Sequence, residues 1–266
     1  MTAHASSQPE LAPPLKWAGG KRWLVPRLAA VWRRHAHRRL VEPFVGGAAV
    51  ALGLRPRAAL LNDSNPHLVN FYRQLQRGLV IALTMANDPR LYYEHRARFN
   101  RLVADGAADT AEAAALFDYL NRTCYNGLCR FNRGGGFNVP FGRHKSINYA
   151  RDFGAYRPAL AGWQFTAGDF AALELGATDF VYADPPYDVE FTAYSPGGFA
   201  WADQVRLAEW LAAHAGPVVA SNQATPKIVA LYERLGFKLE LIAAPRMIAC
   251  NGDRTPAGEM LASKNI

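Results

Sequence analysis

The residues best suited to chemistry lie in one short loop that follows an apolar run. Asp184-Pro185-Pro186-Tyr187 comes directly after residues 180–183. Two prolines after an acid favour a stiff, extended loop with exposed carbonyl groups. The carboxylate and a proline carbonyl can then accept both hydrogens of a planar amino group, which frees its nitrogen lone pair, while the tyrosine ring stacks on the base. The loop predicts chemistry at an exocyclic amine, and the alternative is an ordinary Pro-Pro turn.

A glycine turn after an earlier apolar run is the second candidate site. Residues 40–45 are followed by Gly46-Gly47, and glycine lets a ligand approach the backbone closely. Asp63 ends the next strand-like run, where an acid commonly binds ribose hydroxyls. The pair predicts a ligand site, and the alternative is a packing turn followed by a helix-capping aspartate.

A third glycine segment resembles a phosphate-binding loop only superficially. Residues 17–22 lack the earlier glycine of that motif, Arg22 stands where the motif has Ser or Thr, and no strand precedes it. These departures exclude nucleoside-triphosphate hydrolysis. Lys16 and Lys21, beside two glycines, still indicate anion or ligand contacts.

Cysteine and histidine patterns predict neither a metal site nor a thiol nucleophile. The three cysteines, Cys124, Cys129 and Cys250, form no Cys-x-x-Cys pair, and no partnered base is evident. We therefore expect reduced cysteines, no disulfide framework and no metal.

The elements that must position these loops read as one α/β domain built from two pieces of sequence. Strand-like runs occupy residues 40–45, 58–61, 163–165, 180–183, 217–220 and 238–242, and helical stretches occupy residues 48–54, 203–215 and 226–235. Residues 67–119 are mostly helical, and residues 121–143 predict a hairpin with a glycine tip at 134–136.

Composition and charge narrow the class of protein. Half of the 266 residues are hydrophobic and 20% are charged, which is typical of a globular protein, and no apolar run is long enough for a membrane helix. The N-terminus has no signal-peptide pattern. The net charge is +8, with an excess of basic residues in 1–158 and of acidic residues in 159–266. This split favours a polyanion partner for the first part of the chain, although a solvated basic surface is the alternative.

Taken in order, these motifs resemble the Dam-type DNA adenine-N6 methyltransferases, the D12 class, from residue 15 to about residue 265. The similar segments are residues 15–21, 42–46, 121–122, 125–132, 136–143, 184–187 and 191–194. Their order, with the cofactor loop first, the recognition insertion second and the catalytic loop last, is that of the α group. Ala48 departs from the family, which usually has glycine there, and its methyl group is expected to crowd the loop.

The resemblance implies an S-adenosylmethionine-dependent methyltransferase fold, a mixed, mostly parallel sheet with helices on both faces, whose last hairpin includes an antiparallel strand at 238–242 or 259–262. Residues 12–66 and 159–266 would form the catalytic domain, residues 67–158 a helical and β-hairpin DNA-recognition domain, and residues 1–11 a flexible start. The residues implied to line S-adenosyl-L-methionine are Trp17, Lys21, Phe44, Gly46, Asp63, Asp169 and Phe170. Asp169 also fits a helix N-cap.

The family also implies a duplex DNA partner and a recognition site similar to GATC. Arg130 is expected to read a guanine edge, with a phosphate contact as the alternative. Leu128 and Pro140 would contact a thymine methyl group, and Lys16 an outer guanine. The remaining residues implied to contact DNA are Arg122, Tyr125, Asn126, Asn132 and Arg143, with Tyr125 and Asn126 filling the gap left by a flipped adenine.

In the implied mechanism, Asp184 and the Pro185 carbonyl hold the adenine amino group, Tyr187 stacks on the flipped ring, and Phe199 closes the other side or makes only a packing contact.

Two alternative functions remain. One is methylation of RNA or another amine, and the other is a non-catalytic DNA-binding protein with the same fold. The family's usual setting implies monomeric action in the cytoplasm of a prokaryotic cell or from a phage gene.

Overall fold

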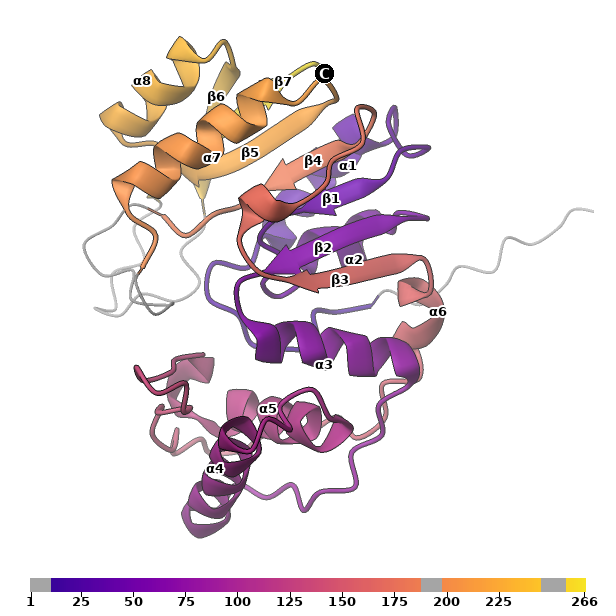
Figure 1. The fold of residues 1–266 in the computed structure, drawn as a ribbon, viewed down its shortest axis with the longest axis vertical. Coiled ribbons are helices and arrows are strands. Elements are labelled where there is room, and N and C mark those ends of the chain that lie inside the picture. Colours follow the sequence, from indigo (N-terminus) through magenta and orange to yellow (C-terminus); the bar gives the residue numbers. More distant parts are fainter. Residues whose placement is uncertain (1–10, 188–197, 245–256) are drawn as a thin grey trace, which may run out of the picture.

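The structure is a computed structural model that describes residues 11–187, 198–244 and 257–266 (Figure 1). Three expectations fall outside these residues: nearly all of the flexible start at 1–11, residues 191–194 of the catalytic-loop motif, and Cys250.

Within the described part of the chain, seven strands form one sheet in the order β3-β2-β1-β4-β5-β7-β6. Its strands are β1 (Leu40–Glu42), β2 (Ala59–Asp63), β3 (Trp163–Ala167), β4 (Phe180–Ala183), β5 (Val218–Gln223), β6 (Lys238–Ala244) and β7 (Ala257–Lys264). The neighbours from β3 to β5 pair in parallel, whereas β7 pairs antiparallel with both β5 and β6. The expected mixed, mostly parallel sheet is confirmed, and β7 is the antiparallel strand.

Helices cover both faces of the sheet (Figure 1). The chain's α1 (Val25–Trp32), α2 (Ala49–Leu54) and α3 (Pro66–Arg77) contribute to one buried cluster, and α7 (Trp201–Ala213) and α8 (Pro226–Arg234) contribute to the other. Adjacent residues of β1 serve opposite faces, because Leu40 belongs to the first cluster and Val41 to the second. This alternation fixes the strand between two hydrophobic layers.

Two local signals fix the chain near the centre of the sheet. The apolar pattern predicted a strand that ends at Val45, but β1 ends at Glu42. The strand stops there because Pro43 has no backbone N–H to donate to the sheet. The side chain of Asn65 accepts hydrogen bonds from the backbone N–H groups of His67 and Leu68 and so begins α3.

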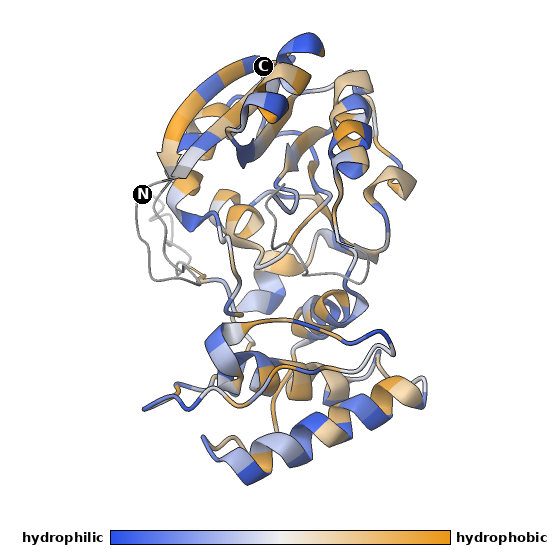
Figure 2. Ribbon diagram, turned by 90° about the vertical axis from the view of Figure 1, so that its left-hand side faces the viewer, coloured by the Kyte–Doolittle hydropathy of each residue, from blue (hydrophilic) through white to orange (hydrophobic). Residues whose placement is uncertain are grey.

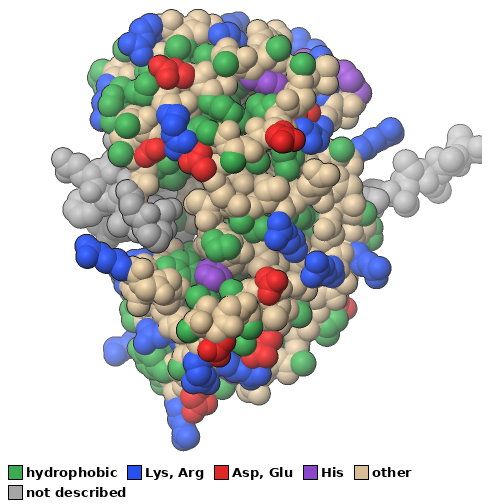
Figure 3. Space-filling model, viewed as in Figure 1, with side chains coloured by type: hydrophobic (Ala, Val, Ile, Leu, Met, Phe, Trp, Pro, Cys, Tyr) green, Lys and Arg blue, Asp and Glu red, His purple; other side chains and the backbone are tan. Residues whose placement is uncertain are grey.

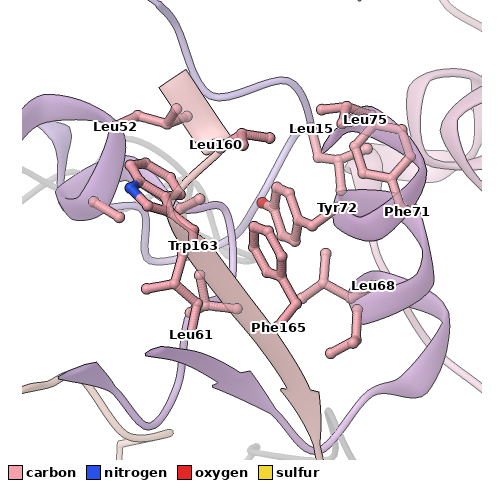
Figure 4. Close-up of a cluster of buried hydrophobic side chains, with 14 of the residues drawn as sticks. Leu15, Leu52, Leu61, Leu68, Phe71, Tyr72, Leu75, Leu160, Trp163 and Phe165 are labelled. Carbon is pink, nitrogen blue, oxygen red and sulfur yellow. The ribbon is translucent and has the colours of Figure 1, made fainter. Parts of the chain in front are cut away.

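An aromatic contact joins α3 to the edge of the sheet (Figure 4). The rings of Tyr72 and Phe165 stack with centroids 5.4 Å apart and planes 10° apart, and Trp163 and Leu160 pack nearby. Leu160 is the last residue of the short helix α6 (Tyr156–Leu160). Burial of these side chains anchors α3 against β3.

A second lobe, at the bottom of Figure 1, contains α4 (Pro89–Ala104) and α5 (Ala111–Thr123). Helix α5 packs on both α4 and α3, so the lobe is joined to the sheet through α3. Helix α4, the lowest helix in Figure 2, carries both hydrophobic and hydrophilic residues along its length, as an amphipathic helix does. The predicted division at residue 67 falls inside α3, which touches both lobes, and this division stays a prediction.

The segment after α5 folds back on itself, as the glycine tip predicted, but without regular strands. The short helix η2 (Tyr125–Gly127) comes first, and isolated antiparallel bridges join Phe131 to Phe137 and Cys124 to Phe141. The side chain of Asn132 closes the tip by accepting hydrogen bonds from the N–H groups of Gly134 and Gly136. We call residues 124–142 the hairpin segment.

Candidate active site

A cavity of about 340 Å³ opens at the carboxyl ends of the parallel strands. It lies where Glu42, at the end of β1, and Asp184, just after β4, both reach its wall. The strand order reverses between β1 and β4, which is the usual ligand position in open α/β sheets. The predicted site residues that line it are Trp17, Lys21, Phe44, Gly46, Asp63, Leu128, Asp184, Pro185, Pro186 and Tyr187.

The glycine turn is shaped by the Trp17 indole. A Cβ atom added at Gly46, whose φ is +46°, would lie 2.6 Å from Trp17 Nε1, and one added at Gly47 would lie 2.9 Å from Trp17 Cβ. Contacts this short require glycine at both positions. The same turn is tied to β2, because the Gly46 N–H donates to Asp63 Oδ2 over 3.1 Å.

Ala48 has a left-handed backbone conformation, with φ of 56°. Glycine, which the family usually has at this position, would adopt this conformation more easily. The Ala48 side chain belongs to the hydrophobic cluster and is absent from the cavity wall among the described residues. Its methyl group therefore does not line the cavity, and the expected crowding of the loop stays a prediction. The departure also leaves a non-glycine residue in a strained backbone conformation.

Glu42 is a site residue that the prediction missed, although its motif was noted. It is buried and lines the cavity, and its Oε1 atom has no hydrogen-bond partner in the structure. Burial, and secondarily the Asp184 charge, raise its pKa well above the usual value. A buried carboxyl oxygen without a partner fits a ligand that brings a donor or a positive charge. The only signal in the sequence was an acid between an apolar run and Pro43.

The loop of residues 184–187 is held from both sides. Asp184 Oδ1 accepts a 2.8 Å hydrogen bond from Ser221 Oγ, and the Pro186 carbonyl accepts one of 2.8 Å from Gln204 Nε2. Gln204 is fixed in turn by Asn222, whose amide donates to it over 2.9 Å. These bonds present the Asp184 carboxylate to the cavity in a fixed position.

Lys21 and Glu259 complete a charged cluster around this loop. Lys21 Nζ lies 3.0 Å from Asp184 Oδ1 and 3.6 Å from Glu259 Oε1. The Tyr187 hydroxyl donates to Glu259 Oε1 over 2.8 Å, and the lysine ammonium lies 4.8 Å from the centre of the Tyr187 ring. Sequence reasoning placed Lys21 on the cofactor and missed Glu259, an acid near the start of β7 that is followed by three apolar residues.

Asp169 and Phe170 do not line the described cavity, but Phe170 contacts a residue that does. Asp169 caps the short helix η3 (Phe170–Ala172) and binds both terminal nitrogens of Arg206, at 2.6 and 2.8 Å. The Phe170 ring packs against Phe44, which does line the cavity, and Phe199 contacts both rings. The helix-cap alternative for Asp169 is confirmed, while its contact with a cofactor stays a prediction.

The N-terminal segment brings Lys16 to the hairpin segment. The Asn121 side chain accepts from the Lys16 N–H over 2.9 Å and donates to the Lys16 carbonyl over 2.8 Å. Gly127 lies against the Lys16 side chain, and Leu128 and Cys129 join the cavity wall. Lys16 and Leu128, both expected to contact DNA, are thus brought to neighbouring parts of the fold, and Leu128 lines the cavity.

The remaining residues expected at DNA divide into exposed and internally bound groups. Arg122 is internally bound, because its guanidinium pairs with Asp118 and also donates to the Pro14 carbonyl. Asn132 closes the glycine tip. The exposed residues of this set are Tyr125, Asn126, Arg130, Asn132, Pro140 and Arg143. The Arg130 guanidinium donates to Asn138 Oδ1 over 2.9 Å.

Basic side chains are exposed on the lobe that contains α4 and α5. In Figure 3, several Lys and Arg side chains project from the lower lobe at its left edge and lower tip. No group of His, Cys, Asp and Glu suited to a metal ion occurs in the part of the chain that the structure describes. Within that same part, no helix is long and apolar enough to cross a membrane.

Comparison with known proteins gives a consistent family. A sequence model of the D12 class N6 adenine-specific DNA methyltransferases matches residues 17–248. A DNA N-6-adenine-methyltransferase of Escherichia phage P1 is 38% identical over 256 residues, which cover 90% of this chain and 33% of the phage protein, so the chain spans a third of that relative's length.

Two relatives match over nearly their whole length. The retron Ec67 DNA adenine methylase of Escherichia coli is 34% identical over 93% of this chain and 90% of its own. The DNA adenine methylase of Escherichia coli strain K12 is 36% identical over 93% of each chain.

Proposed function

Because the chain belongs to the D12 class N6 adenine-specific DNA methyltransferases, we propose that it transfers the methyl group of S-adenosyl-L-methionine to the N6 amino group of adenine in a short site of double-stranded DNA, GATC. The observation that carries the proposal is the convergence of the Asp184 loop and the Gly46 turn on one cavity. One loop is suited to an exocyclic amine, and the other to the cofactor that methylates it.

The cavity fits a cationic cofactor. Three carboxyl groups, those of Glu42, Asp63 and Asp184, line it together with the ammonium of Lys21, and the Glu42 Oε1 atom has no partner in the structure. When bound, the cofactor supplies a methyl group on a positively charged sulfur. The Trp17 ring and the glycine turn would hold it by close backbone approach, and Asp63 would accept its ribose hydroxyls.

The catalytic loop acts on the amine. Asp184 and the Pro185 carbonyl accept its two hydrogens, while Tyr187 stacks on the adenine ring. N6 would accept the methyl group through the lone pair that these hydrogen bonds free, and one of its two hydrogens would leave as a proton to solvent. Because the cavity lies within the protein, a paired base can reach Asp184 only after it is flipped out of the duplex.

The DNA contacts are assigned to the mouth of the cavity and the hairpin segment. We assign base-edge reading to the exposed Arg130, and filling of the gap in the stack to Tyr125 and Asn126, which are also exposed. Leu128 and Pro140 supply apolar contact to thymine, and Lys16 reaches the outer guanine. We assign phosphate contact to Arg143, and to Arg122 only if it leaves its internal partners.

On the same reasoning, residues 67–158 recognise the target, and residues 12–66 and 159–266 perform the transfer. The protein acts as a monomer in the cytoplasm of a prokaryotic cell, with either a host or a phage gene as its source.

The experiment is methyl transfer from tritiated S-adenosyl-L-methionine to duplex DNA, RNA and protein, followed by nucleoside analysis of the labelled product. We expect N6-methyl-2′-deoxyadenosine from duplex DNA. Label in RNA, in N4-methylcytosine or in protein would identify one of the alternative amine substrates, and DNA binding without any label would identify a non-catalytic protein.

A further inference from the structure

Asp184, the residue assigned to the target amine, is engaged by other groups in the absence of DNA. Its Oδ1 atom accepts from Ser221 Oγ at 2.8 Å and also lies 3.0 Å from the ammonium of Lys21. An amine hydrogen that binds this oxygen must compete with the ammonium for it. Since an ammonium–carboxylate contact is stronger than a neutral hydrogen bond, use of Oδ1 by the amine requires Lys21 to move.

Glu259 is placed to receive the displaced ammonium. Its Oε1 atom lies 3.6 Å from Lys21 Nζ, so a shift of less than an ångström would make this contact as short as the one to Asp184. Both side chains are nearly inaccessible to solvent, at 6% and 5% exposed, so water can compensate neither charge well. The buried ammonium therefore needs a second carboxylate whenever it leaves the first.

The fold explains why a residue from the last strand reaches this point. β7 runs antiparallel to β5, with Glu259 opposite Gln223 near the carboxyl end of β5. A residue close to the start of β7 consequently lies at the same sheet edge as Asp184. Glu259 Oε1 also accepts the Tyr187 hydroxyl over 2.8 Å, which fixes the ring expected to stack on adenine.

We propose that Glu259 is a positioning residue for methyl transfer, which draws Lys21 off Asp184 when the target amino group binds and holds Tyr187 in its stacking position. The inference rests on the proposed function of the Asp184 loop. Burial raises the pKa of Glu259, while Lys21 and the Tyr187 hydroxyl oppose this rise, so the same contacts that position Lys21 also favour the charged glutamate.

The test is a double-mutant cycle of Glu259→Gln and Lys21→Met, read by single-turnover methylation of duplex DNA. Glutamine retains an acceptor for the Tyr187 hydroxyl and removes only the charge. We expect Glu259→Gln to lower the single-turnover rate about tenfold or more, with little change in cofactor or DNA affinity. In the Lys21→Met background the same substitution should have almost no effect, because no ammonium is left to move.

Two further variants separate the roles and control for folding. Tyr187→Phe removes the hydroxyl contact but keeps the charge of Glu259, so it should lower the rate less than Glu259→Gln does. Glu240→Gln changes an exposed glutamate on β6, in the same sheet as Glu259, that pairs with Arg27 of α1, and it should leave the rate unchanged. Thermal unfolding of each variant shows whether the fold is retained.

The outcomes are distinct. Equal losses from Glu259→Gln in both backgrounds, or a wild-type rate in Glu259→Gln, overturn the inference while the proposed function stands. A wild-type protein that transfers no methyl group to DNA overturns the proposed function and this inference with it.

Discussion

The backbone N–H of Gly46 donates a 3.1 Å hydrogen bond to Oδ2 of Asp63, which joins the turn after β1 to the end of β2. The other oxygen, Oδ1, accepts from the Asn65 N–H over 3.0 Å. Burial nevertheless outweighs both bonds and raises the Asp63 pKa to about 6. The group expected at the cofactor ribose therefore changes charge just below neutral pH.

Cofactor affinity should consequently depend on pH through Asp63. The ionised carboxylate is the better acceptor for ribose hydroxyls, so affinity for S-adenosyl-L-methionine should rise as the pH increases through about 6. Asp63→Asn should flatten this rise, and Asp63→Ala should weaken binding by about 1.5–3 kcal/mol. Calorimetric titrations at several pH values measure both effects. Asp105→Asn, beyond the end of α4, is the control, and an Asp63→Ala affinity equal to wild type would leave Asp63 a purely structural role.

Gly46→Ala should disturb both stability and cofactor binding. The added Cβ would lie 2.6 Å from Trp17 Nε1, and the positive φ adds about 1–2 kcal/mol of strain for a residue other than glycine. We expect a lower free energy of unfolding in urea and weaker cofactor binding.

Gly20→Ala is the matched control, because its Cβ would meet only the Trp17 carbonyl at an ordinary 3.5 Å. If Gly20→Ala and Gly46→Ala changed stability and binding equally, the close approach of Trp17 to the turn would not be what requires glycine at position 46.

Binding to duplex DNA should weaken steeply with salt. Residues 1–158 carry the excess of basic charge, and each phosphate contact contributes about −0.9 to the slope of log K against log salt. Fluorescence anisotropy with a duplex lacking GATC, at several salt concentrations, measures the slope. A nearly flat response would contradict the polyanion interpretation of the charge split.

Arg130→Ala should relax the choice of sequence at one base pair. Arginine can bind guanine O6 and N7 with two hydrogen bonds, so its loss should remove about 1–3 kcal/mol of discrimination at that position. Sequencing of methylated adenines after treatment with wild type and variant measures this. Arg133→Ala, an exposed neighbour at the glycine tip, is the comparison, expected to weaken all sites alike. A uniform loss from Arg130→Ala would instead assign that residue to phosphate, and a wild-type motif unrelated to GATC would contradict the proposed site.

The sequence predicted those features of the fold that depend on residues within a single helix, strand or turn. The buried run of β4 placed Asp184 at a strand end, and the mostly helical pattern predicted for residues 67–119 agrees with α3, α4 and α5. The glycine tip predicted the reversal of the hairpin segment. It did not show that the pairing is limited to isolated bridges, because pairing length depends on packing against α4 and α5.

Contacts between distant elements were beyond local reasoning. Glu259 is an acid near the start of β7, and only the antiparallel placement of this strand brings it to Tyr187 and Lys21. The binding of Asp169 by Arg206, from α7, likewise has no signal in the spacing of either residue.

The most direct test of the account is the labelled product formed by wild type and Asp184→Ala under saturating S-adenosyl-L-methionine. We expect wild type to form N6-methyl-2′-deoxyadenosine in duplex DNA. We expect Asp184→Ala to lose at least about a hundredfold in rate while it still binds DNA, because the carboxylate serves the amine and not the phosphates. A variant that keeps more than about a few per cent of the wild-type rate would contradict the role assigned to Asp184, and a wild-type product other than N6-methyladenine would contradict the proposed reaction.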